Sequence, residues 1–122
     1  MVGQDAAGVA KLSWARLAVR FQIIILPQAK RDAREIDEFL AAQDPAVADR
    51  FLENLQSTLE LQASIPTLGS PWISQNPATA SLRWTRVRAF TKYVIFLRVI
   101  GSVMEVVRII HGARDLDELL GS

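Results

Sequence analysis

The sequence predicts an α+β two-layer fold in which a helical hairpin packs on one face of a mainly antiparallel sheet. Apolar residues recur at helical spacing in two consecutive segments between residues 28 and 64, with an Asp-Pro pair between them. After residue 80 the pattern changes to β-branched, apolar-rich runs. The chain has 122 residues, half of them hydrophobic, which is enough for one domain with a buried core. The expected element order is β-α-α-β-β-β.

The N-terminal part of the chain predicts a tail followed by a strand. Residues 1–18 show weak periodicity, so we expect an N-terminal tail or extension there and a single domain over residues 19–122. Residues 19–26 are rich in β-branched and aromatic side chains and stop at Pro27. This run predicts a strand that ends where a helix begins.

Two amphipathic helices follow. The apolar positions of the first are Ala33, Ile36, Phe39 and Leu40. The pattern fades at Gln43, and Asp44-Pro45 predicts a new start, with an N-cap carboxylate and a proline at the first helical position. The second helix is expected to end before Ile65 and to bury Ala48, Phe51, Leu52, Leu55 and Leu59.

The second half of the chain predicts a loop and three strands. Residues 67–80 contain Gly69, Pro71 and Pro77, which predict a loop. Gly101-Ser102 is the glycine-first pair of a type II′ hairpin turn. The strands are expected at residues 82–87, 93–100 and 103–110, followed by a short C-terminal piece at residues 114–120.

The composition excludes several classes of chemistry. The chain has no cysteine, so disulfides, thiolate nucleophiles and cysteine-based zinc sites are excluded. A single histidine, His111, is too few for a multi-histidine metal site, so we expect neither metal nor cofactor. The most apolar stretch, residues 17–26, is too short for a membrane span and is interrupted by Arg20; no secretory signal is recognised, and a cytoplasmic location is expected.

The net charge of +1 conceals an acidic half and a basic half. Residues 28–66 hold four basic and eight acidic side chains, whereas residues 67–114 hold seven basic side chains and one acid, Glu105. Such polarity is typical of two faces with different roles, although both faces could simply keep the protein in solution.

Strand alternation predicts where the arginines lie. It groups Arg86 and Arg88 with Leu82 and Trp84, and Arg83 with Thr85 and Val87. In the later strands it groups Arg98 with Val94, Phe96 and Ile100, and Arg108 with Met104, Val106 and Ile110. An arginine beneath packed helices is costly unless paired, so we expect an uncovered, arginine-studded face that suits an acidic peptide or a nucleic-acid backbone. The alternative, that Arg98 or Arg108 pairs with Glu105 or a helix acid, remains open.

Several segments, taken in order, resemble ParE-type toxins of the RelE/ParE superfamily of bacterial toxin–antitoxin (plasmid stabilisation) modules. They are residues 26–32 (LPQAKRD), the helical hairpin, Leu82-Arg83, residues 93–98 (YVIFLR) and, above all, residues 111–115 (HGARD). The resemblance runs from about residue 20 to residue 120. One departure is Leu97, where the family commonly has tyrosine.

The resemblance implies a small cytoplasmic toxin held inactive by a cognate ParD-like antitoxin whose acidic C-terminal segment folds over the toxin. ParE-like members inhibit DNA gyrase by binding and are not catalysts; on this reading the chain has no catalytic residues, no membrane partner and no sequence-specific nucleic-acid site. RelE-like members instead cut messenger RNA on the ribosome without a metal. That alternative would use Arg83, Lys92, Arg98 and His111, and it predicts that these four cluster in one pocket. A third reading is a member that binds antitoxin but is no longer toxic.

The candidate site residues follow from these readings. The residues expected to contact antitoxin or target are Arg83, Arg86, Arg88, Arg98 and Arg108. The ending His111, Gly112, Arg114 and Asp115 is interpreted as structural: the glycine permits a turn after the last strand, and the aspartate pairs with Arg114 or caps the final turn. Trp72 and Trp84 are either partner anchors or loop plugs.

Overall fold

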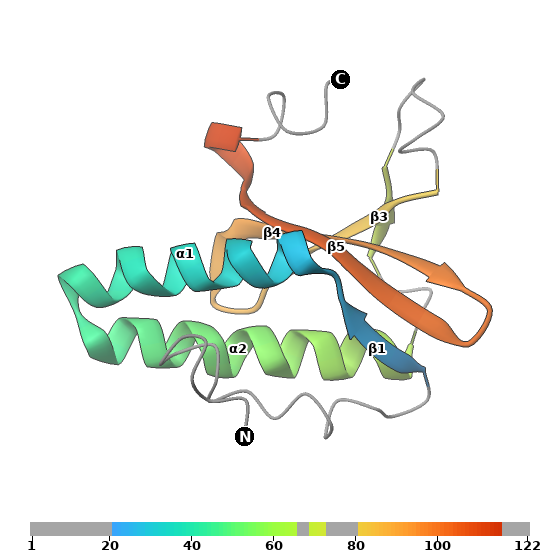
Figure 1. Ribbon diagram of the computed structural model, residues 1–122, viewed down its shortest axis with the longest axis horizontal. Helices are drawn as coiled ribbons and strands as arrows, with labels where there is room; N and C mark the ends of the chain where they lie inside the picture. The colour runs from blue at the N-terminus through green and yellow to red at the C-terminus, as the bar shows by residue number, and fades with distance from the viewer. Residues whose placement is uncertain (1–20, 66–68, 73–80, 116–122) are drawn as a thin grey trace.

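The computed structural model describes residues 21–65, 69–72 and 81–115, and within them it has the two layers that the sequence predicts (Figure 1). The elements are β1 (Gln22–Ile25), α1 (Pro27–Gln43), α2 (Pro45–Ser64), β2 (Ser70–Pro71), β3 (Arg83–Val87), β4 (Phe90–Ile100) and β5 (Val103–His111). Residues 112–115 are helical. The predicted tail at residues 1–18, most of the predicted loop, and the C-terminal piece beyond residue 115 lie outside the described residues.

The helical hairpin forms where the capping residues predict it. Pro27 starts α1 after an extended Leu26, and the helix ends as the backbone N–H of Asp44 donates to the carbonyl of Leu40. The Asp44 carboxylate then accepts from the N–H of Ala46 at 3.0 Å, with Pro45 at the first position of α2. The predicted restart at Asp44-Pro45 is therefore confirmed. No described helix is long and apolar enough to cross a membrane.

The sheet has the strand order β1-β5-β4-β3-β2. β1 pairs parallel with β5, and the helical hairpin provides the long connection that a parallel pair needs; the other neighbours are antiparallel. Gly101 has φ 61° in a two-residue turn, as a type II′ hairpin requires. Ser70–Pro71 pairs with β3, so the prediction of an uninterrupted loop over residues 67–80 is wrong there. Proline is tolerated because β2 is an edge strand.

The main core lies between the hairpin and the sheet. Phe51 of α2 is fully buried, and its ring meets Phe90 and Tyr93 edge to face at centroid distances of 5.4 and 5.3 Å. The sheet contributes Val87, Tyr93, Ile95, Leu97, Met104, Val106 and Ile109 to this core. Phe39, predicted on the apolar face of α1, is instead 53% exposed and lines a cavity of about 290 Å³ beside that helix.

A bulge in β5 changes which residues face the helices. Leu97 pairs with Val106 but Phe96 pairs with Arg108, so Val107 is an additional residue on β5. After it the alternation shifts: Ile109 joins the main core with Met104, and Ile110 packs on the other side of the sheet. The prediction that Met104, Val106, Arg108 and Ile110 share one face is therefore wrong, because the extra residue reverses the inward and outward positions.

The face of the sheet turned away from the hairpin, here called the outer face, has its own small apolar cluster. Its buried members are Leu82, Val94, Phe96 and Ile110, with Trp72, Trp84 and Val107 packed against them. Because α1 and α2 both lie on the opposite face (Figure 1), this cluster is the base of a second surface.

Candidate functional site

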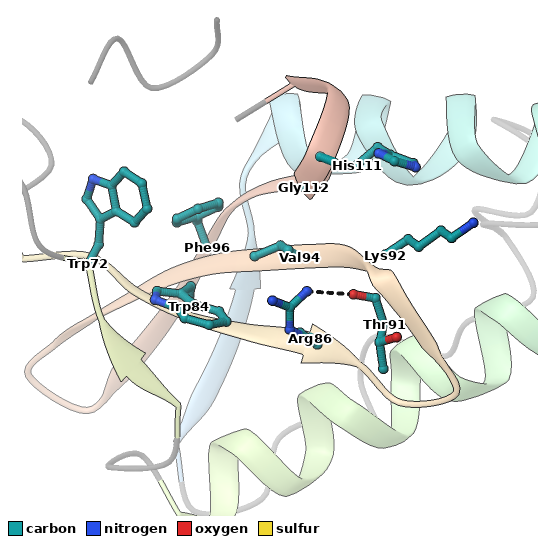
Figure 2. Close-up of a pocket in the computed structure, with 10 residues that line it drawn as sticks. Trp72, Trp84, Arg86, Thr91, Lys92, Val94, Phe96, His111 and Gly112 are labelled. Atoms are coloured by element: carbon teal, nitrogen blue, oxygen red, sulfur yellow. Dashed lines mark hydrogen bonds between the residues drawn. The ribbon is translucent and has the colours of Figure 1, made fainter. Parts of the chain in front are cut away.

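A groove on the outer face, here called the outer-face groove, has a volume of about 710 Å³ (Figure 2). β4 supplies its floor through Val94 and Phe96, which alternate outward from the same strand that buries Tyr93 and Ile95. The remaining described lining residues are Trp72, Trp84, Arg86, Thr91, Lys92, His111, Gly112 and Ala113. Grooves of this size accommodate small ligands or peptide side chains.

One end of the groove is aromatic. Trp72, directly after β2, packs edge to face on Phe96 at 5.4 Å between ring centroids. Its position is set by the N–H of Trp72, which donates to the carbonyl of Leu82 at 2.8 Å. Trp84 extends from β3 into the same groove. Both tryptophans therefore line the groove.

The middle and the other end of the groove are basic. The Arg86 guanidinium lies over the Trp84 ring at 5.4 Å and donates to the carbonyl of Thr91 at 2.8 Å, which holds it above the floor. Lys92 is exposed at the end nearer His111 (Figure 2). Among the described residues that line the groove, none is acidic.

His111 lies between the outer-face groove and the smaller cavity beside α1, and it lines both. Its ring meets Tyr93 edge to face at 5.5 Å. Its Nδ1 atom is buried without a hydrogen-bond partner. Burial raises the pKa of the Tyr93 hydroxyl, an effect that the positive charge of Arg114 opposes and the negative charge of Asp115 reinforces.

Gly112 of the C-terminal ending makes a close packing contact, and glycine is required there for a different reason from the predicted one. Gly112 does not have a positive φ. A Cβ at this position would lie 2.9 Å from Cγ2 of Val94, so glycine allows the helical turn at residues 112–115 to approach β4. Arg114 pairs with Asp115 at 3.3 Å, as predicted.

The five predicted arginines do not converge. Arg86 lines the outer-face groove, whereas the described part of the chain places the others elsewhere. Arg83 donates to the carbonyl of Gly69 at 3.0 Å. Arg88 is exposed in the β3–β4 turn, where its backbone N–H donates to the Thr58 hydroxyl at 3.0 Å.

The pairing alternative is confirmed for the remaining two arginines. Arg98 binds Glu105, its cross-strand neighbour, at 2.7 Å. Arg108 binds Asp32 of α1 through Nε at 2.7 Å and Nη2 at 3.0 Å, and the same carboxylate accepts from the N–H of Ile109 at 3.0 Å. The hydrogen bond to Asp32 raises the pKa of Arg108, which burial opposes.

The four residues of the ribonuclease alternative do not share one pocket. Lys92 and His111 line the outer-face groove, but Arg83 and Arg98 do not. Within the described residues, no group of three or more metal-ligating side chains comes together. Sequence reasoning did not assign Val94, Phe96 or Thr91 to a site, although alternation had placed Val94 and Phe96 on one face.

Comparisons with known proteins identify a family from the sequence and a similar fold among solved structures. A family model described as the ParE toxin of the type II toxin-antitoxin system parDE matches residues 23–116. The curated protein Toxin RelE1 of Caulobacter vibrioides is 30% identical over 92 residues, covering 75% of this chain and 94% of that protein. A solved structure described as the chromosomal ParDE TA system from P. aeruginosa superposes with a TM-score of 0.62 at 15% identity, covering 75% of this chain and 96% of that one.

Proposed function

The chain belongs to the ParE toxin family of type II toxin–antitoxin systems, and we propose that it inhibits DNA gyrase by binding, in the cytoplasm, until a cognate ParD-like antitoxin neutralises it. The family itself implies the antitoxin partner. Inhibition by binding needs a shaped surface, whereas ribonuclease chemistry needs several proton-transfer and charge-stabilising groups around one phosphate.

The observation that carries this proposal is the dispersal of the groups that cutting RNA would need. Arg98 is held by Glu105, and Arg83 reaches back to Gly69, so neither lines the groove that contains Lys92 and His111. A metal-free ribonuclease site would place these cations within hydrogen-bonding reach of one phosphate. Their separation supports a binding inhibitor.

A plasmid cleavage assay tests the proposal. Purified protein, DNA gyrase, ATP and supercoiled plasmid should yield linear DNA covalently linked to gyrase. A reaction without gyrase controls for a nuclease. His111→Gln should keep this activity, because an inhibitor that acts by binding does not need the imidazole as an acid or base. Intact supercoiling activity with no linear DNA would reject gyrase as the target.

The alternative, ribosome-dependent cleavage of messenger RNA, has one observation in its favour. Lys92 and His111 lie in the same groove, and a lysine and an imidazole are suitable groups for proton transfer to and from a ribose and its phosphate. A translation assay that maps cut sites on ribosome-bound messenger separates this alternative from gyrase inhibition. Inactivity in both assays would indicate a member that has lost toxicity.

For neutralisation, we place the antitoxin on the helical hairpin and the outer face of the sheet. Basic strand residues there would attract an acidic segment. Reversing Arg86 and Arg88 together to glutamate should weaken antitoxin binding without unfolding the protein. Unchanged affinity would count against a basic contact surface.

A further inference from the structure

We infer that the outer-face groove is an anchor site for one bulky apolar side chain flanked by carboxylates, supplied by an acidic segment of the antitoxin. This inference rests on the proposed neutralisation by an antitoxin and names the chemistry of the contact. Two features of the groove support it: its apolar lining and its charge.

The apolar part of the groove is built for a large side chain. Val94 and Phe96 form the floor, and the rings of Trp72 and Trp84 form the walls at one end (Figure 2). Val94 and Phe96 are already buried, so the apolar surface that a bound side chain would cover belongs mainly to the partly exposed Trp72 and Trp84. Aromatic pockets of this kind carry much of the binding energy in protein interfaces, because a bulky anchor is fully desolvated there.

The charge of the groove selects an acidic partner. Arg86 and Lys92 are the charged residues among the described lining, and no acid faces them. The acids of residues 28–66 lie on α1, on α2 or between them, and both helices lie on the other side of the sheet. An acidic segment is therefore attracted to the outer face, where the guanidinium and the ammonium can each bind a carboxylate.

Two buried nitrogens belong to residues that line the groove. Among the described residues, Trp72 Nε1 and His111 Nδ1 are the buried side-chain polar atoms without a hydrogen-bond partner, and both residues line this groove. A buried polar group without a partner costs about 1–3 kcal/mol. Both atoms are shielded from solvent, so an acceptor on a bound segment reaches them only if the Trp72 or His111 side chain rotates.

The structure of the groove also indicates which of the five predicted arginines can contact a bound segment. Arg98 and Arg108 are neutralised by Glu105 and Asp32, so they contribute little to attraction of a partner. Arg86 and Arg88 lie two positions apart, but only Arg86 lines the groove. Lys30, exposed on α1, is a matched control for Lys92.

The test is a phage-displayed library of random dodecapeptides panned against the purified toxin. The selected peptides should be enriched in Trp, Phe or Leu next to Asp or Glu. Lys92→Glu should weaken binding of a selected peptide about 5- to 10-fold, and Trp84→Ala about 30-fold or more. Lys30→Glu should leave affinity within about twofold. Lys92 is exposed, so this variant folds even if Trp84→Ala does not.

A charge swap makes the test specific. A selected peptide with its acids replaced by lysine should bind Lys92→Glu better than it binds the wild-type protein. No enrichment, enrichment of basic peptides, or equal weakening by Lys92→Glu and Lys30→Glu would overturn the inference. The inference would also be overturned if oligo(U) displaced a selected peptide from the wild-type protein but not from Lys92→Glu, while both proteins bound the peptide with the same affinity. No step uses gyrase, so failure of the cleavage assay and failure of this inference are separate results.

Discussion

The clamp between Asp32 and Arg108 should be one of the largest single contributions to stability made by polar groups. Asp32 is 6% exposed and accepts four hydrogen bonds, from Arg108 Nε and Nη2, the N–H of Ile109 and the Gln28 amide. Asp32→Ala leaves a guanidinium and a backbone N–H without their acceptor. Removing one partner of a buried pair costs about 3–5 kcal/mol. Because 19% of the Arg108 side chain is exposed, we expect about 3 kcal/mol.

Urea unfolding measures this loss. With a slope of about 2 kcal/mol per molar, typical of a small domain, the midpoint should fall by roughly 1.5 M. The matched control is Glu105→Ala, because the Arg98–Glu105 pair is more exposed, at 35% and 21%, and should contribute roughly 0–1 kcal/mol. Both ion pairs involve β5, so the comparison isolates burial.

A double variant separates the charge from the hydrogen bond. Asp32→Ala combined with Arg108→Met removes the unpaired cation and should be more stable than Asp32→Ala alone. A deficit of about 1–3 kcal/mol should remain, because the N–H of Ile109 still lacks its acceptor. A cost below about 1 kcal/mol for Asp32→Ala, or strict additivity of the two substitutions, would refute the reasoning.

Three further outcomes are expected. Burial raises the pKa of Tyr93, the sole tyrosine, so its tyrosinate absorbance should titrate with a midpoint above 10.0 in the folded protein. The associated contribution to stability is complete below pH 10.0 and is lost as the pH rises through the pKa of the folded state. A midpoint at or below 10.0 would contradict this. Gly112→Ala should lower the free energy of unfolding by about 1–3 kcal/mol, measured with urea, because the new Cβ clashes with Val94. Val94→Ala in the same chain should recover part of this loss. An unchanged urea midpoint for Gly112→Ala would show that the contact is not tight. Ala89 has φ 65°, so Ala89→Gly should raise thermal stability by about 0.5–1 kcal/mol, and a lower melting temperature would disprove strain there.

The helices were predictable because their signals are local. Asp44 supplies the N-cap and Pro45 the first position of α2, and in the structure the Asp44 carboxylate accepts from the N–H of Ala46. The same holds for the turn at Gly101-Ser102, where the two residues determine the hairpin geometry. The α+β fold follows from these short-range patterns.

The predictions that were wrong concern residues whose local structure depends on distant parts of the chain. Nothing in the local sequence marks Val107 as the additional residue of a bulge, because the β-branched run on either side of it reads as regular alternation. Arg108 acquires its partner from Asp32, 76 residues earlier. Ser70–Pro71 becomes a strand because β3 offers it an edge, which the composition of a proline-containing loop does not reveal.

The candidate site was half predictable. Alternation placed Trp84 and Arg86 together, and it placed Val94 and Phe96 together, so the composition of the groove was readable strand by strand. The contribution of Trp72 and Gly112 required the tertiary structure, because each approaches β4 from a segment outside the three long strands.

The parallel pairing of β1 with β5 has a consequence for the order of folding. Gln22 pairs with Val103 and Ile25 with Val106, contacts that span about 80 residues of chain. Closing so large a loop is slow, and during synthesis β1 has no partner until β5 has left the ribosome. The α1–α2 hairpin can form early from local contacts, but the five-stranded sheet and the groove on its outer face are completed last. A nascent chain therefore gains the outer-face groove only after β5 has been synthesised.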